Sequence, residues 1–185
     1  MGTTFQNVTV RGPDRDAVVE QLRSYGERGY VAPTSNSFTV VFPSRGSGWN
    51  QPEAAADLAL SLAHDLSGVA LVSGVFDDDL LALQLYESGG LAFEYLSSER
   101  RCLNLQRFCE VLGRPAARVP ALFLLKVPRP LPLLFESFRH LYLARLLRLP
   151  EWACFNDYES IQANLDGAGE FELPGGLNAS ALQRT

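Results

Sequence analysis

Three consecutive aspartates, Asp77, Asp78 and Asp79, form the densest group of chemically capable side chains in the sequence. Carboxylate oxygens are the ligands that hard cations prefer, so a cation site is one interpretation. The alternating ligands and distant Glu of an EF-hand are absent, however, and Asp is a common turn former because its side chain hydrogen-bonds to nearby backbone. We therefore expect an acidic turn that contributes to recognition of a basic partner, and no metal site.

Cysteine and histidine offer a second kind of chemistry. Cys102 and Cys109 would share one face of a helix, and together with His140 and Cys154 they could be drawn as a zinc site. Structural zinc ligands usually come in close pairs such as C-x₂₋₄-C, which this sequence lacks. A nucleophilic pair of Cys109 and His140 would need a lowered thiol pKa, and no family motif surrounds either residue. We expect buried cysteines and assign no catalytic residue, metal or cofactor.

The two tryptophans are candidates for partner binding, because Trp is enriched among residues that dominate binding energy at interfaces. Trp49 lies in a loop, residues 45–50, that lacks the glycine pattern of a phosphate-binding motif. Trp152 begins an aromatic series with Phe155 and Tyr158. The alternatives are that Trp49 covers the core and that the series packs a helical segment onto a sheet.

Composition limits the classes of function. The chain has 185 residues, 46% of them apolar and 20% charged, which is typical of a globular protein. A net charge of −5 argues against general nucleic-acid binding, which requires an excess of basic residues. Lys126 is the sole lysine beside many arginines, a bias typical of GC-rich bacterial genomes.

The same considerations predict where the protein resides. Three cysteines without a framework, and no recognisable signal peptide, favour a reduced cytoplasmic location. Prolines and charges interrupt the longest apolar region, residues 119–149, so we expect no membrane span.

These residues are carried by alternating strands and helices in the first half of the chain. Apolar and polar residues alternate as in strands, and apolar residues recur at helical spacing between them. The pattern predicts strands at residues 5–10, 30–32, 37–42, 69–76, 80–86 and 91–95, and helices at 14–25 and 52–66.

This β-α-β-β-α-β order resembles the ferredoxin-like α+β sandwich, here extended by an antiparallel hairpin. The resemblance covers residues 5–96 and rests on element order alone. It implies a fold without specifying an activity, because this architecture supports many functions.

The second half predicts an α-helical extension. We expect a short helix at residues 104–112 beginning near Ser98 or Glu99, a Pro-rich segment at 115–132 and a strong helix at 133–149. The predicted organisation is an α+β sandwich domain at residues 1–97, a helical extension at 98–163 packed on it, and a loose tail at 164–185.

Together these observations favour a non-catalytic module that binds another protein. One specific hypothesis is a bacterial immunity or antitoxin-like factor that blocks a toxin, with Asp77, Asp78, Asp79, Trp49 and Trp152 in contact with the partner. The alternatives are a small-ligand sensor, for which a homodimer would be compatible, and an enzyme with a pocket between the sheet and the helical extension.

Overall fold

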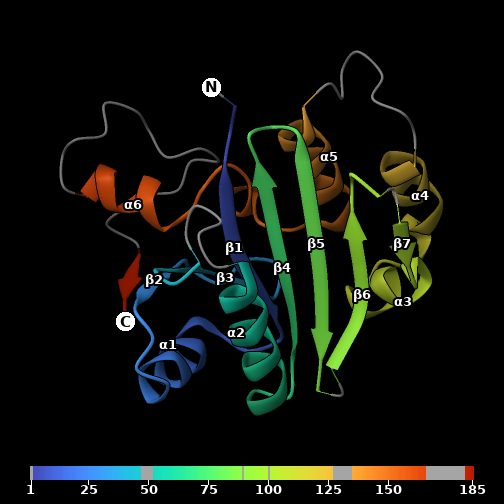
Figure 1. Ribbon diagram of the computed structural model, residues 1–185. Coiled ribbons are helices and arrows are strands. Elements are labelled where there is room, and N and C mark those ends of the chain that lie inside the picture. Colours follow the sequence, from blue (N-terminus) through green and yellow to red (C-terminus); the bar gives the residue numbers. More distant parts are fainter. Residues whose placement is uncertain (1, 47–51, 89, 100, 127–134, 166–181) are drawn as a thin grey trace.

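Eight strands form a single antiparallel sheet in the computed structural model of the protein (Figure 1). The structure describes residues 2–46, 52–88, 90–99, 101–126, 135–165 and 182–185. Along the sheet the strands follow the order β7-β6-β5-β4-β1-β3-β2-β8, so the first strand lies in the middle. The α+β prediction is confirmed.

The strands lie close to the positions that alternation predicts. In chain order they are β1 (Phe5–Arg11), β2 (Gly29–Val31), β3 (Phe38–Pro43), β4 (Val69–Phe76), β5 (Leu80–Glu87), β6 (Gly90–Leu96), β7 (Arg101–Leu103) and β8 (Gln183–Arg184).

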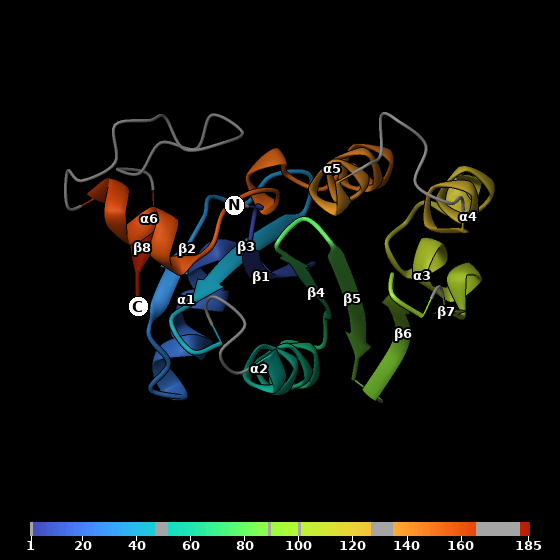
Figure 2. The same ribbon diagram turned by 45° about the horizontal axis from the view of Figure 1, so that its top comes forward.

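Helices cover the sheet on both sides (Figure 2). One face carries α1 (Arg15–Ser24) and α2 (Pro52–Asp65). The other face carries the helices of the C-terminal half, which are α3 (Leu105–Val111), α4 (Arg118–Lys126), α5 (Glu136–Leu147) and α6 (Tyr158–Leu165), together with short 3₁₀ turns at Pro115–Ala117 and Glu151–Ala153.

The two faces of the sheet are covered unequally. Leu81, Leu83 and Leu85 of β5 point toward α3–α5 and belong to the largest apolar core. On the opposite face Ala82 and Gln84 remain half-buried, whereas Tyr86, further along β5, belongs to the apolar cluster that includes residues of α2. The alternating burial of β5 therefore records a sheet with one fully covered and one partly open face.

The extension departs from the predicted order in two places. Strand β7 occupies Arg101–Leu103, and α3 begins only at Leu105. The prediction that the helix begins near Ser98 or Glu99 is therefore wrong. Helix α4 lies within the Pro-rich segment, with Pro120 in its first turn, where a missing backbone N–H costs little. Helix α5 falls within the predicted helix and ends before Arg148, whose φ of 57° is left-handed.

The C-terminal residues rejoin the sheet. Residues 166–181 of the predicted tail lie outside the described residues, but β8 pairs with β2 through Gln183 and Arg184. None of the helices in the described ranges is long and apolar enough to cross a membrane.

Candidate functional site

The three aspartates form the turn between β4 and β5. Asp77 and Asp78 adopt left-handed backbone angles, with φ of 48° and 58°, which Asp tolerates better than most residues. Asp77 Oδ1 accepts a hydrogen bond from Gly2 N at 2.8 Å, and Asp78 Oδ2 accepts one from Thr3 N at 2.8 Å. The aspartate turn thus holds the segment that leads into β1.

The same turn holds the start of α5. The backbone N–H of Glu136 donates to Asp78 O at 2.9 Å, which gives one otherwise unpaired N–H at the helix N-terminus an acceptor. The aspartate turn and α5 are therefore neighbours in space, although about 58 residues separate them in sequence.

Helix α5 presents exposed aromatic side chains beside this turn. Phe135, Phe138 and Tyr142 are 49%, 44% and 44% exposed, and their spacing of three and four residues places them on one face. The rings of Phe135 and Phe138 lie 6.2 Å apart, and Phe138 also contacts the ring of Phe155 at 6.4 Å. We call Phe135, Phe138 and Tyr142 the α5 aromatic stripe.

A buried ion pair fixes the core-facing side of α5. Glu136 and Arg139 form an ion pair at 2.9 Å, with 2% and 3% of their side chains exposed. Arg139 Nη1 donates to Leu124 O at 2.5 Å at the end of α4, and Tyr95 Oη of the sheet donates to Leu125 O at 2.9 Å. These bonds connect sheet, α4 and α5, so the orientation of the stripe is set by the core beneath it.

Of the two tryptophans, the structure describes only Trp152. Trp152 is half-buried and packs against the apolar cluster that contains Tyr30 and Ile161. This position is compatible with the packing alternative, and the cluster includes residues of β2 and β3, which lie on the other side of β1 from the β4–β5 turn. Trp49 lies outside the described residues.

The cysteines and His140 do not show the features of an activated pair. Burial raises the pKa of the Cys109 thiol, and burial lowers the pKa of His140 to about 4. Both shifts favour neutral groups, whereas a nucleophilic thiolate needs the opposite. The His140 ring packs 5.3 Å from the ring of Phe5. Cys102, Cys109 and Cys154 form no disulfide.

A groove of about 500 Å³ opens on the other face of the sheet, beside α2. Its floor comes from β1, β4, β5 and β6, and three glutamates line it: Glu53 of α2, Glu94 of β6 and Glu99. We call it the β5–β6 groove. It lies on the face of the sheet opposite the helical extension, whereas the enzyme alternative expected a pocket between the sheet and that extension. The alternation of Gln84 with Leu83 and Leu85 was the available sequence signal for an open face here.

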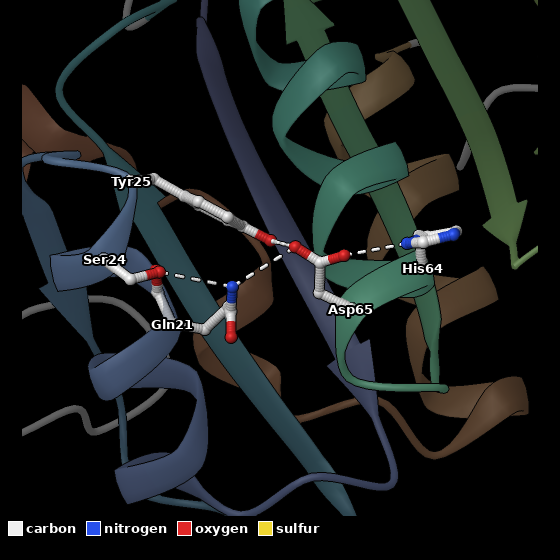
Figure 3. A network of polar contacts seen from close by, with 5 residues as sticks. All are labelled: Gln21, Ser24, Tyr25, His64 and Asp65. Carbon is white, nitrogen blue, oxygen red and sulfur yellow. Dashed lines mark hydrogen bonds and ion pairs between the residues drawn. The ribbon is translucent and has the colours of Figure 1, made fainter.

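A polar network connects the two helices that flank this face (Figure 3). Asp65 at the end of α2 accepts hydrogen bonds from Tyr25 Oη at 2.6 Å and from Gln21 Nε2 at 3.3 Å, and it lies 2.8 Å from His64 Nδ1. The hydrogen bonds from His64 and Tyr25 lower the pKa of Asp65. Burial and the bond to Asp65 raise the pKa of Tyr25 to about 12. The network joins α1 to α2 at an exposed position.

Neither a metal site nor a similar protein points to a function. Among the described residues, no group of three His, Cys, Asp or Glu side chains is arranged to hold a metal ion. No family model matches the chain, and comparison with curated proteins and with solved structures finds no similar protein.

Proposed function

We propose that the protein is a non-catalytic module that binds another protein through the α5 aromatic stripe and the adjacent aspartate turn. The observation that carries this proposal is the exposure of Phe135, Phe138 and Tyr142 on one helix face beside Asp78. Aromatic side chains supply large contact area at interface centres, and charged residues at the rim guide association.

The chemistry of this surface favours a basic partner. The aspartate turn lies beside the N-terminal end of α5, where the aromatic stripe begins, and the whole protein carries a net charge of −5. Opposite charge accelerates encounter, and aromatic burial slows dissociation. A bacterial immunity or antitoxin-like factor that covers a basic toxin surface is the specific form of the proposal.

We also propose that the sheet contains a ferredoxin-like unit. Strands β4-β1-β3-β2 are neighbours in that order, each pair is antiparallel, and α1 and α2 lie on one face. Strands β5, β6 and β7 extend this unit on one side and β8 extends it on the other.

Quantitative affinity capture from the native host tests the partner proposal. Phe138→Ala with Tyr142→Ala should reduce the captured partner by about tenfold or more, because truncated interface anchors commonly cost over 1 kcal/mol each. Leu60→Ala with Leu103→Ala is the matched control, since these exposed apolar residues lie away from α5. Equal loss in both variants, or a partner retained by both, contradicts the assigned surface.

The aspartates are tested by association kinetics with the captured partner. Replacing Asp77, Asp78 and Asp79 with Asn keeps side chains that tolerate the turn geometry while it removes the charge. Association should become slower and less dependent on salt, whereas dissociation should change little. Unchanged association rates would exclude the turn from the contact surface.

A second candidate function, small-ligand binding, is favoured by the β5–β6 groove on the opposite face. Its volume lies within the range of about 300 to 1,000 Å³ that is typical of ligand pockets.

A further inference from the structure

The floor of the β5–β6 groove contains a buried acceptor that no described residue satisfies. Gln6 is only 4% exposed, and its Oε1 is buried without a hydrogen-bond partner among the described residues. Gln6 of β1 is paired with Gly74 of β4, which in turn is paired with Ala82 of β5. These neighbours have no polar side chain, and Gln6 itself lines the groove, so a donor bound there lies beside the Gln6 side chain.

Among the described residues, the charged ones that line the groove are all acidic. Glu53 lies in the first turn of α2, where it offsets the positive end of the helix dipole. Glu94 and Glu99 add negative charge on the side of β6. Glu94 Oε1 also accepts a hydrogen bond from Gln84 Nε2 at 3.1 Å, which orients its carboxylate over the sheet.

Apolar surface accompanies this charge. Ala56, Val72 and Leu96 line the groove between the acidic positions, and Gly74 and Ala82 leave space above the sheet. The groove therefore combines carboxylates, one unsatisfied carbonyl oxygen and room for a short alkyl chain, within about 500 Å³.

We infer that the β5–β6 groove binds a small organic cation, a guanidinium or ammonium group on a short alkyl chain. Its N–H groups donate to the carboxylates of Glu94 and Glu99 and to Gln6 Oε1, and its alkyl chain lies on Ala56 and Leu96. Guanidinium fits best, because its planar set of donors can satisfy several acceptors at once. This site is separate from the α5 aromatic stripe, so either assignment can fail while the other holds.

Titration of the full chain with three matched probes tests the inference. The probes are butylguanidinium, butylammonium and the neutral isostere butylurea, followed by amide chemical shifts in NMR spectra. Butylguanidinium should shift the amides of Gln6, Gly74 and Ala82 saturably, with a dissociation constant on the order of 1 mM or tighter. Butylurea should bind at least about tenfold more weakly, because it lacks the charge that the carboxylates attract.

Variants test whether the named groups make the contacts. Glu94→Gln should weaken butylguanidinium binding by about tenfold, and Gln6→Met should weaken it by a smaller factor, since one charge-assisted bond outweighs one neutral bond. Glu20→Gln with Glu159→Gln removes exposed carboxylates elsewhere and should leave binding unchanged. If Gln6→Met lowers the unfolding temperature, its weaker binding could come from a disturbed fold. Glu94→Gln alone then tests whether the groove binds the cation.

A blocked Gly-Arg-Gly peptide separates two sources of the cation. Binding tighter than that of butylguanidinium would identify an arginine side chain of a polypeptide, and weaker binding would identify a free small molecule. Equal binding of butylurea, no saturable shift with either cation, or shifts confined to other regions would overturn the inference.

Discussion

Neighbouring residues of β5 experience opposite environments on the two faces of the sheet. Leu85 is fully buried against the helical extension, whereas Gln84 is half-buried beside the β5–β6 groove. The extension covers its face with α3, α4 and α5, and it brings a buried ion pair into that layer. Both layers bury apolar clusters against the sheet, but only the helical extension covers β5 at both Leu83 and Leu85, and the other layer leaves Ala82 and Gln84 half-buried.

Removing one member of the buried ion pair should lower the free energy of unfolding far more than removing one member of an exposed ion pair. Arg139→Met leaves Glu136 buried without its partner, which should lower the free energy of unfolding by about 3 to 5 kcal/mol. The double variant Glu136→Met with Arg139→Met should recover much of this loss, because neither charge of this pair then remains. Unfolding in urea measures both values.

The control for this prediction is Arg107→Met. Arg107 forms a two-bond ion pair with Glu87, with distances of 2.8 and 2.6 Å, at an exposed position. Solvent screens such pairs, so its loss should change stability far less. A comparable loss for Arg107→Met would contradict the assignment of the Arg139 effect to burial.

Two adjacent residues of β5 compare the contribution of the two sheet faces to stability directly, with a smaller expected difference. Leu85→Ala removes buried side-chain atoms from the core beneath the extension and should cost about 2 to 5 kcal/mol. Gln84→Ala, one residue away on the open face, should cost less than about 1 kcal/mol. Equal losses in urea unfolding would mean that the face beside α2 contributes as much stability as the covered face.

The smallest expected effect concerns the exposed link between α1 and α2. The pKa of Asp65 is lowered in the folded protein, so the unfolded chain binds its proton more readily. The stabilisation is present above the unfolded pKa of about 3.9 and is lost as pH falls through the lower folded pKa. Asp65→Asn should therefore flatten the pH dependence of stability below about pH 4.

The unfolding temperature, measured from about pH 5 to about pH 2.5, tests this change. Asp57→Asn, which removes a carboxylate elsewhere on the same helix, is the control. An unchanged profile for Asp65→Asn would show that the network in Figure 3 does not contribute to folding stability.

Local sequence pattern was sufficient for the strands and helices of the first half. Phe93 and Tyr95 alternate with Ala92 and Glu94, and that period follows directly from strand geometry. The pattern failed where a local signal was ambiguous, as at Pro120, which is compatible with either a loop or the first turn of α4.

Features that depend on distant segments could not be predicted. The two residues of β8 form a strand only because β2 offers them a partner. The β5–β6 groove combines Gln6, Glu53 and Glu94, which no sequence spacing connects. The adjacency of the aspartate turn to α5 likewise depends on a backbone bond between Asp78 and Glu136.

The central position of β1 has a consequence for synthesis. Among the described strands of this sheet, β1 leaves the ribosome before the others, yet its two neighbours are β3 and β4, and β4 ends only at Phe76. Throughout that interval the apolar side chains of β1 have an incomplete sheet around them, and unpaired strands of this kind are prone to aggregate. The bonds from Gly2 and Thr3 must wait still longer, for Asp77 and Asp78 to emerge. Slowed translation would therefore favour correct assembly of the nascent sheet only after Asp78 has left the ribosome.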